Sequence, residues 1–285
     1  MKQDEAVRGE AVLETEAAND AYRDLEQWSR ADLLSALVGG HEAALAATRQ
    51  ALPALTTALD AAVPRIRAGG RLVYAGAGTS GRLATLDAAE LGPTFGWPKE
   101  RAFALLAGGE GALTQAREGA EDEGTAGKAA VGAVGVGPDD VVLAVAASGR
   151  TPFTLAAAGE ARSRGALVVG IANNPDAPLL AACDHAILLR TGPEVLAGST
   201  RLAAGTAQKI ALNAFSTGLM IALGRTAGGR MVAMRATNAK LRERARLMLV
   251  EMTGCDPQIA RTALETSGYD LPTALRVVGA RLEED

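Results

Sequence analysis

The stretch RLVYAGAGTSGR, residues Arg71–Arg82, is a short apolar run that ends in a loop of glycine and hydroxyl side chains. Such an uninterrupted apolar run is typical of a strand buried on both faces of a parallel sheet. Four similar runs follow, each leading into a helical pattern: Ala102–Ala107, Asp140–Ala146, Ala166–Ile171 and His185–Leu189. Parallel strands that alternate with helices are joined by right-handed crossovers. The sequence therefore predicts an α/β fold, a doubly wound five-stranded parallel sheet flanked by helices.

Helical patterns cover residues 29–67, 200–223 and 236–252, and the C-terminal tail adds two short helices. Pro53 and Pro64 are expected to interrupt the first pattern. Asp256 and Asp270 each precede a proline closely, so both are expected to be N-caps of the short helices.

The composition divides the chain into three parts. Residues 1–28 are polar and are expected to form a loosely docked N-terminal segment. Residues 29–235 are expected to form the main domain with its N-terminal helices, and residues 236–285 a small helical appendage.

Three of the predicted strands lead to loops that combine glycine, a hydroxyl side chain and arginine: Gly76–Arg82, Ala147–Pro152 and, beyond the fifth strand, Gly198–Arg201. Ligands of open parallel sheets bind beyond the carboxyl ends of the strands. Glycine allows close approach of the backbone to an anion, hydroxyl groups donate to phosphate oxygens, and helix N-termini favour negative charge. Any one of these loops is explained equally well by a capped helix start, but three together predict a site for a phosphate monoester.

The predicted phosphate contacts are Ser80, Ser148, Gly149 and Thr151, with Thr79, Ser199 and Thr200 as second choices. Arg82 and Arg150 are possible helpers, although arginine just inside a helix is as often a solvated surface residue.

Gly76, Gly78 and Gly81 also match the G-x-G-x-x-G fingerprint of dinucleotide-binding folds. That fingerprint requires an acidic residue at the end of the second strand, and the first acid beyond that strand is Glu110, after two glycines. Thr79 and Ser80 in the loop also suit a terminal phosphate better than a pyrophosphate. A dinucleotide cofactor is therefore not expected.

The composition argues against several other classes of protein. The formal net charge of −4 gives no electrostatic reason to expect nucleic acid. Two cysteines without a CxxC and two histidines do not suggest a disulfide framework or a zinc site. The charged start of the chain lacks the apolar region of a signal peptide, and no apolar run approaches the length of a membrane span. A cytoplasmic protein without a metal or membrane partner is expected.

Six blocks of the chain, in order, resemble the SIS (sugar isomerase) domain and, within it, the muramic acid 6-phosphate etherases. They are GRLVYAGAGTSGRLATLDAAE (Gly70–Glu90), AGGEGALTQAREGAED (Ala107–Asp122), AASGRTPF (Ala146–Phe153), GPEVLAGSTRL (Gly192–Leu202), GTAQKIALNAFST (Gly205–Thr217) and ATNAKL (Ala236–Leu241). The resemblance implies an SIS-type fold, with a C-terminal tail similar to a ubiquitin-associated helical domain. It covers nearly the whole chain from about Leu13.

The chain departs from the family pattern at three places. The family commonly has SECPPTF where this chain has AELGPTF (Ala89–Phe95), and often has lysine at the position of Ala203. The early NPAS-like stretch is NDAY here (Asn19–Tyr22). These differences affect the walls of the expected pocket and leave its two acids in place.

The resemblance implies that Glu90 and Glu121 are catalytic and that the reaction needs no cofactor. In the implied reaction Glu121 removes the C2 proton of an open-chain sugar phosphate, and Glu90 protonates the departing lactyl oxygen and then activates water. Glu121 is expected on or after the helix that follows the second strand, and both acids are expected at the same end of the sheet. From the residues alone each acid is better explained as a helix surface carboxylate, and only the family resemblance chooses Glu121 over its neighbour Glu118.

The resemblance also implies homodimers whose sites lie near the subunit interface. Glu194 is a candidate contact of a sugar hydroxyl or else a plain loop acid, and Lys209 could face either the site or solvent.

Two other functions fit the same fold. An aldose–ketose sugar-phosphate isomerase would move a proton between C1 and C2 and release no lactate. A non-catalytic regulator would bind a sugar phosphate without turnover, but the related glucokinase regulators have two SIS domains in tandem, and this chain has room for one.

Overall fold

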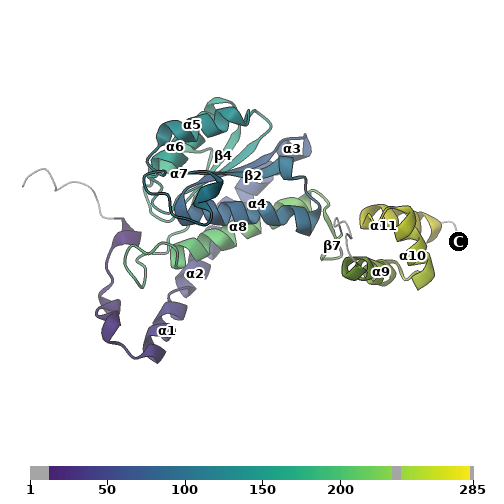
Figure 1. Cartoon of the computed structure of the whole chain (residues 1–285), viewed down its shortest axis with the longest axis horizontal. Coiled ribbons are helices and arrows are strands. Elements are labelled where there is room, and N and C mark those ends of the chain that lie inside the picture. The colour runs from purple at the N-terminus through teal and green to yellow at the C-terminus, as the bar shows by residue number, and fades with distance from the viewer. Residues whose placement is uncertain (1–12, 233–238, 283–285) are drawn as a thin grey trace, which may run out of the picture.

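The computed structural model describes residues 13–232 and 239–282 (Figure 1). Its main sheet has five parallel strands in the order β2-β1-β3-β4-β5, which confirms the predicted fold class. The strands are β1 (Leu72–Gly76), β2 (Ala102–Leu106), β3 (Val141–Val145), β4 (Leu167–Ala172) and β5 (His185–Leu188). β1, β3 and β4 are buried along their whole length, as their continuous apolar sequences predict.

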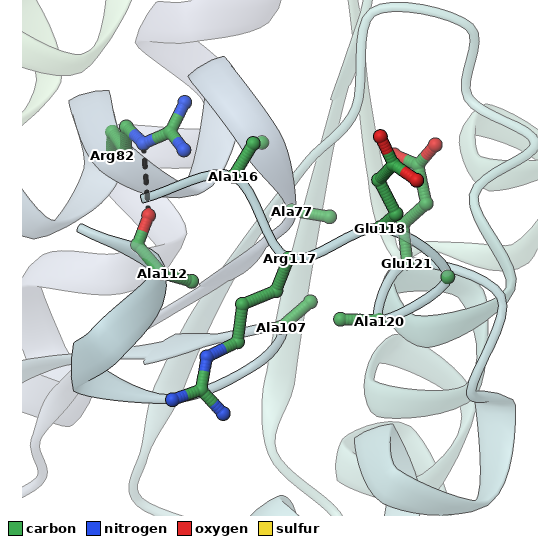
Figure 2. Close-up of a pocket in the computed structure, with 11 residues that line it drawn as sticks. Ala77, Arg82, Ala107, Ala112, Ala116, Arg117, Glu118, Ala120 and Glu121 are labelled. Atoms are coloured by element: carbon green, nitrogen blue, oxygen red, sulfur yellow. Dashed lines mark hydrogen bonds between the residues drawn. The ribbon is translucent and has the colours of Figure 1, made fainter. Parts of the chain in front are cut away.

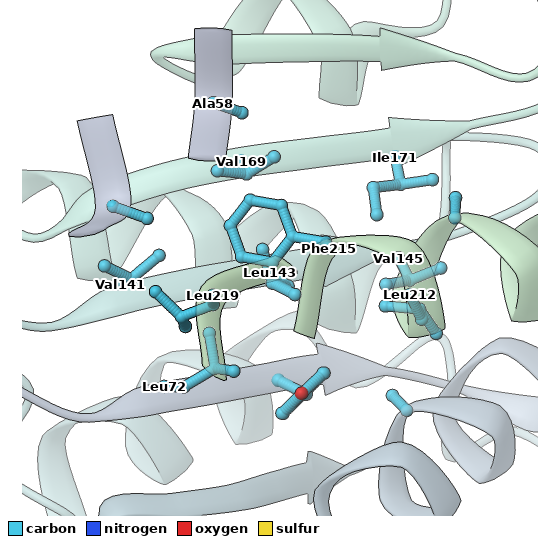
Figure 3. Close-up of a cluster of buried hydrophobic side chains, with 14 of the residues drawn as sticks. Ala58, Leu72, Val141, Leu143, Val145, Val169, Ile171, Leu212, Phe215 and Leu219 are labelled. Carbon is cyan, nitrogen blue, oxygen red and sulfur yellow. The ribbon is translucent and has the colours of Figure 1, made fainter. Parts of the chain in front are cut away.

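Two layers of helices cover the sheet, and the strands send alternate side chains to each. On one face lie α3 (Leu52–Arg67), α4 (Gly78–Phe95) and α8 (Ala203–Ala222); on the other lie α5 (Gly124–Ala133), α6 (Pro152–Ser163) and α7 (Pro178–Ala182). Figure 3 shows Leu212, Phe215 and Leu219 of α8 packed over the strands. Burial of such side chains contributes roughly 1.5–3 kcal/mol each, so the helices are held firmly to the sheet.

The N-terminal helical pattern forms three helices, α1 (Arg30–Gly39), α2 (Glu42–Gln50) and α3. Pro53 lies in the first turn of α3, as expected, but the prediction that Pro64 interrupts a helix is wrong, because it lies inside the last turn of α3. A proline there removes only one hydrogen bond near a helix end. α1 has no buried residue and projects from the sandwich in Figure 1.

The segment before α1 contains three short 3-10 helices, η1 (Glu14–Glu16), η2 (Asp20–Tyr22) and η3 (Leu25–Gln27). The expectation of loose docking is wrong for η1, because Thr15 is fully buried and hydrogen-bonded to Asn174 across the sheet edge.

The C-terminal helices α9 (Ala239–Thr253), α10 (Pro257–Thr266) and α11 (Leu271–Leu282) lie together at one end of the molecule and share their own apolar cluster (Figure 1). Asp256 accepts a hydrogen bond from the Gln258 N–H at 2.7 Å, and Asp270 accepts one from the Thr273 N–H at 3.1 Å, so both predicted N-caps are confirmed. The helix expected over 236–252 is described from Ala239 onward; residues 236–238 lie outside the described residues. A short hairpin, β6 (Thr226–Ala227) and β7 (Arg230–Met231), precedes this region.

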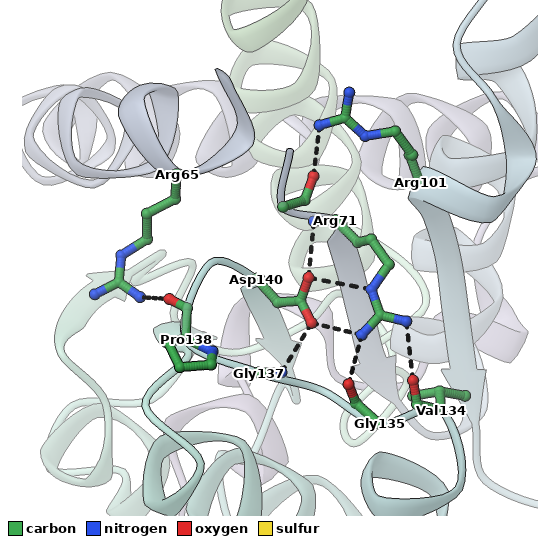
Figure 4. A network of polar contacts seen from close by, with 9 residues as sticks. Arg65, Arg71, Arg101, Val134, Gly135, Gly137, Pro138 and Asp140 are labelled. Carbon is green, nitrogen blue, oxygen red and sulfur yellow. Dashed lines mark hydrogen bonds and ion pairs between the residues drawn. The ribbon is translucent and has the colours of Figure 1, made fainter. Parts of the chain in front are cut away.

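At the amino end of the sheet, Arg71 and Asp140 join the starts of β1 and β3 (Figure 4). The Asp140 carboxylate accepts hydrogen bonds from the Arg71 side chain at 2.6 Å, from the Arg71 N–H at 2.8 Å and from the Gly137 N–H at 2.9 Å. Burial alone would raise the pKa of Asp140, but these hydrogen bonds lower it below its ordinary value. The opposite, carboxyl end of the sheet is thus left free for a site.

Candidate active site

The first two predicted loops start from directly paired residues at the carboxyl edge of the sheet. Gly76 at the end of β1 pairs with Val145 at the end of β3. The helices that follow these strands, α4 and α6, cover opposite faces of the sheet. This is the topological switch point of a doubly wound sheet, where ligands bind in the crevice between the diverging loops.

The first loop brings the start of α4 very close to β1. Gly78 has a φ of 53°, and a Cβ on Gly81 would lie 2.6 Å from the Gly76 carbonyl oxygen, so the sequence requires glycine at both positions. No side chain caps α4, and its first turn has no acidic residue. The N–H groups of that turn, beside buried Ser80 and half-buried Thr79, are therefore available to an anion.

The second loop, at the start of α6, also contains a glycine that no other residue could replace. Gly149 has a φ of 64°, and a Cβ there would lie 2.4 Å from the Ala177 methyl group. Ser148 accepts a hydrogen bond from the Arg150 N–H at 3.1 Å, and the Thr151 side chain makes no capping bond. Ser148 and Thr151 are half-buried and Arg150 is exposed.

The third loop approaches the first at Gly205 in α8. A Cβ on Gly205 would lie 3.1 Å from the Thr200 carbonyl oxygen and 3.4 Å from the Thr79 methyl group. Ser199 and Thr200 are half-buried. The structure thus brings the first loop beside both of the others.

Glu194 has a different place from the one the sequence suggested. It is 1% exposed, and its two carboxylate oxygens accept hydrogen bonds from the N–H groups of Ala203 and Ala204, at 2.8 and 2.9 Å. These groups are the first donors of α8, which a carboxylate satisfies especially well. Glu194 is therefore committed to capping α8 and is not presented to the loops as a free carboxylate.

Glu121 lines a cavity of about 230 Å³ next to the first loop (Figure 2). The other lining residues are Ala77, Gly78, Arg82, Ala107, Ala112, Ala116, Arg117, Glu118, Gly119 and Ala120. The prediction that Glu121 lies on or after the helix following β2 is wrong: that helix is α5, which begins at Gly124. Only a short 3-10 turn, η5 (Glu110–Ala112), forms between β2 and Glu121, in a segment where Gly109 and Gly119 have positive φ.

Glu90 does not reach this cavity within the same chain. It is exposed on α4, which places it about 18 Å along the helix axis from Gly78 and about 12 Å from Arg82, the last residue of the first loop. α4 runs back along the sheet, so the expectation that both acids lie at the same end is wrong for a single chain. Exposed Leu86, Ala89 and Pro93 share the helix face of Glu90.

A buried polar cluster beneath Glu90 fixes the rotation of α4. The Asp87 carboxylate accepts hydrogen bonds from the Tyr74 hydroxyl at 2.6 Å, from the Asn213 amide at 2.5 Å and from the Ser216 hydroxyl at 3.1 Å. Burial and the neighbouring Asp87 charge raise the pKa of Tyr74 well above its ordinary value. The cluster joins β1, α4 and α8, so Glu90 is held on the outer face.

Sequence reasoning missed one element of the site, the bridge between Thr15 and Asn174. The Asn174 amide donates to the Thr15 hydroxyl and to the Ala147 carbonyl, each at 2.9 Å, and accepts from the Thr15 N–H at 3.3 Å. The Gly198 N–H donates to the Thr15 carbonyl at 3.3 Å. η1 therefore ties the second loop to the third, and the only available signal was the pair of asparagines directly after β4.

Within the described residues, no group of three His, Cys, Asp or Glu side chains is placed to hold a metal ion. None of the helices in 13–232 and 239–282 has both the length and the apolar character needed to span a bilayer.

Comparison with known proteins identifies the architecture and the family. Residues 54–162 match the model of the glucokinase regulatory protein N-terminal SIS domain, and residues 130–218 match that of the SIS domain. The structure of a phosphoheptose isomerase from Francisella tularensis is similar with a TM-score of 0.54 at 20% identity, covering 68% of this chain and all of that one. This likeness supports the SIS fold.

The sequence relatives are much more similar. An N-acetylmuramic acid 6-phosphate etherase of Deinococcus radiodurans is 56% identical over 92% of this chain and 86% of its own length. Another, of Rubrobacter xylanophilus, is 48% identical over 94% of this chain and 88% of its own. With two glycine-lined loops at the switch point and this degree of identity, the chain belongs to the N-acetylmuramic acid 6-phosphate etherase family.

Proposed function

We propose that this protein is a carbon–oxygen lyase that cleaves the D-lactyl ether of N-acetylmuramic acid 6-phosphate. The products are N-acetylglucosamine 6-phosphate and D-lactate, a reaction of cell-wall amino sugar recycling. The observation that best supports this proposal is that Glu121 lines a cavity together with Gly78 and Arg82 of the first loop, in a chain 56% identical to an etherase.

The substrate phosphate binds between the first turns of α4 and α6. The first turn of α4 offers uncapped N–H groups, and Ser80, Ser148 and Thr151 add hydroxyl donors. The backbone of the α6 turn adds less, because Pro152 has no N–H and the Phe153 N–H is donated to the Glu121 carbonyl oxygen. Gly149 lets the backbone of the second loop approach the phosphate, and Thr79, Ser199 and Thr200 complete the rim where the third loop meets the first.

Glu121 is the base that removes the proton from C2 of the open-chain aldehyde, where the neighbouring carbonyl acidifies that proton. The electron pair left on C2 forms the C2–C3 double bond as the C3–O bond breaks. Glu90, protonated, gives its proton to the departing lactyl oxygen. As a carboxylate it then takes a proton from the water that adds at C3 of the unsaturated aldehyde, and protonated Glu121 returns its proton to C2.

We further propose that the protein is a homodimer in which the partner subunit's Glu90 completes the site. Within one chain Glu90 lies about 18 Å along α4 from Gly78 and about 12 Å from Arg82, and it does not line the cavity that these residues share with Glu121. We infer that the two acids of one chain do not meet at one C2–C3 bond. The helix face around it is apolar and uncovered: Leu86 is 43% exposed on α4, and Ile221 is 55% exposed on the neighbouring α8. A second copy covering this face would bury these side chains and bring its own α4 to the cavity.

We place the reaction in the cytoplasm, because both cysteines, Cys183 and Cys255, are free thiols, as is usual in a reducing compartment. Isomerase and regulator functions are not favoured. An isomerase needs no lactyl leaving group, and a regulator needs no second acid.

The direct test is to incubate the purified protein with N-acetylmuramic acid 6-phosphate and to measure D-lactate with a coupled dehydrogenase. Stoichiometric release of D-lactate and N-acetylglucosamine 6-phosphate is expected. Binding of the substrate without lactate release would instead favour a regulator, and conversion of an aldose phosphate to a ketose phosphate would favour an isomerase.

A further inference from the structure

The cavity that contains Glu121 also contains two arginines without acidic partners. Arg82 and Arg117 both line it, and neither belongs to an ion pair in the described part of the chain. Glu118 and Glu121, although in the same cavity, are not paired with them either. Figure 2 shows the Glu118 and Glu121 carboxylates close together on one side of the cavity; on the other side, the Arg82 and Arg117 guanidinium groups lie apart, with Ala112 between them.

The η5 turn holds Arg82 by a hydrogen bond and lies beside Arg117. The Arg82 Nε–H donates to the Ala112 carbonyl oxygen at 2.9 Å, which leaves the terminal N–H₂ groups for another acceptor. Arg117 lies against Gly108 and Gly111: a Cβ on Gly111 would be 2.5 Å from Arg117 Nη2, and one on Gly108 would be 3.1 Å from its Cδ. Only glycine at these positions leaves room for the observed side chain.

The remaining wall of the cavity is made largely of methyl groups, from Ala77, Ala107, Ala112 and their neighbours. Its volume of about 230 Å³ is below the roughly 300–1,000 Å³ of pockets that enclose whole drug-sized ligands. A small space that combines alanine methyl groups with two guanidinium groups outside any ion pair suits a short carboxylic acid, because arginine binds carboxylates with paired hydrogen bonds.

We propose that this cavity binds the D-lactyl group of the substrate, with Arg82 and Arg117 pairing its carboxylate and the alanine wall receiving its methyl group; the proposal rests on the proposed function. The lactyl oxygen is attached to C3, one bond from the carbon that Glu121 deprotonates, so both groups belong at the same cavity. Pairing the lactyl carboxylate with arginine also removes its repulsion of the Glu121 carboxylate. Arg82 and Arg117 are then the residues that select an etherase substrate over a plain sugar phosphate.

The test compares ligands with and without the lactyl group. For Arg117→Gln and Arg82→Gln, we expect the KM for N-acetylmuramic acid 6-phosphate to rise about 10- to 100-fold, as loss of a charged hydrogen bond implies. Competitive inhibition by N-acetylglucosamine 6-phosphate, which lacks the lactyl group, is expected to stay within about twofold of wild type. Arg164→Gln is the matched control, since Arg164 is on the far end of α6 and paired with Glu160, and both constants should stay unchanged.

An unchanged KM in both arginine variants would overturn the proposal, and so would an equal loss of affinity for the two ligands, which would indicate general damage to the site. If the wild-type protein releases no D-lactate, the proposed function fails. In that case, calorimetry with the same two ligands on wild type and Arg117→Gln still tests whether the cavity binds the lactyl group. A selective loss of affinity for the lactyl-bearing ligand can be measured without turnover.

Discussion

The backbone N–H of Phe153 donates a hydrogen bond to the carbonyl oxygen of Glu121, with an N–O distance of 3.0 Å. This bond attaches the irregular segment that carries the proposed base to the first turn of α6, where the second phosphate loop ends. The proposed base and the second phosphate loop are therefore held in a fixed relation, as transfer of a proton from a bound sugar requires.

Replacing the proposed base should stop catalysis while leaving binding intact. For Glu121→Gln we expect kcat to fall by at least about 10²-fold, because general-base catalysis contributes roughly that factor or more. The inhibition constant of N-acetylglucosamine 6-phosphate should hardly change. Glu118→Gln, on the same wall of the cavity, is the control and should keep most of the activity. Near-normal turnover by Glu121→Gln would assign the role to another group.

Mixing two inactive variants tests the shared site. Glu90→Gln should release no lactate on its own while still binding the sugar phosphate. If each site takes Glu121 from one subunit and Glu90 from the other, a mixed dimer of Glu90→Gln and Glu121→Gln contains one intact site. Random exchange of subunits should then restore about a quarter of wild-type activity. No recovery in mixtures shown by mass spectrometry to contain mixed dimers would mean that each subunit supplies both acids.

Loosening the bridge at Thr15 should weaken both substrate binding and folding. Thr15→Val leaves a buried Asn174 N–H without its acceptor, which costs about 1–3 kcal/mol. We expect a several-fold rise in KM, because the second and third loops lose their common anchor, and a modest fall in Tm. Thr56→Val, which alters an exposed hydroxyl on α3, should change neither. A fall in Tm with an unchanged KM would show that the bridge serves stability alone.

The Arg71–Asp140 pair predicts a pH dependence of stability. Because the folded-state pKa of Asp140 is lowered, its contribution is complete above the unfolded-state pKa and is lost as the pH falls through the folded-state pKa. Asp140→Asn should therefore lower the free energy of unfolding at pH 7 by about 1.5–3 kcal/mol. The difference in the free energy of unfolding between this variant and wild type, measured by urea titration, should decrease below about pH 4. Asp60→Asn, an exposed change on α3, should give a wild-type profile. A difference in the free energy of unfolding that stayed constant with pH would contradict the lowered pKa of Asp140.

The sheet was predictable from sequence because parallel strands buried on both faces leave continuous apolar runs, as in Leu72–Gly76 and Val141–Val145. The starts of α4 and α6 were predictable because only glycine fits beside the strand ends. The position of Glu90 was predicted wrongly, although the helix rise between Gly78 and Glu90 already separates it from the first loop. Any contact with a second copy of the chain is not visible in a single sequence. Glu194 was beyond local reasoning because its partners begin nine residues later, at a helix start that tertiary packing brings to it.

The bridge from Thr15 to Asn174 spans 159 residues of sequence. During synthesis Thr15 leaves the ribosome long before its partner exists, so the rim that holds the phosphate cannot close until β4 has been made and threaded beside β3. A chain truncated after α6 would carry both glycine loops and the proposed base, yet it would lack Asn174, which links the second loop to Thr15. Assembly of a working site is thus deferred until most of the domain has been translated.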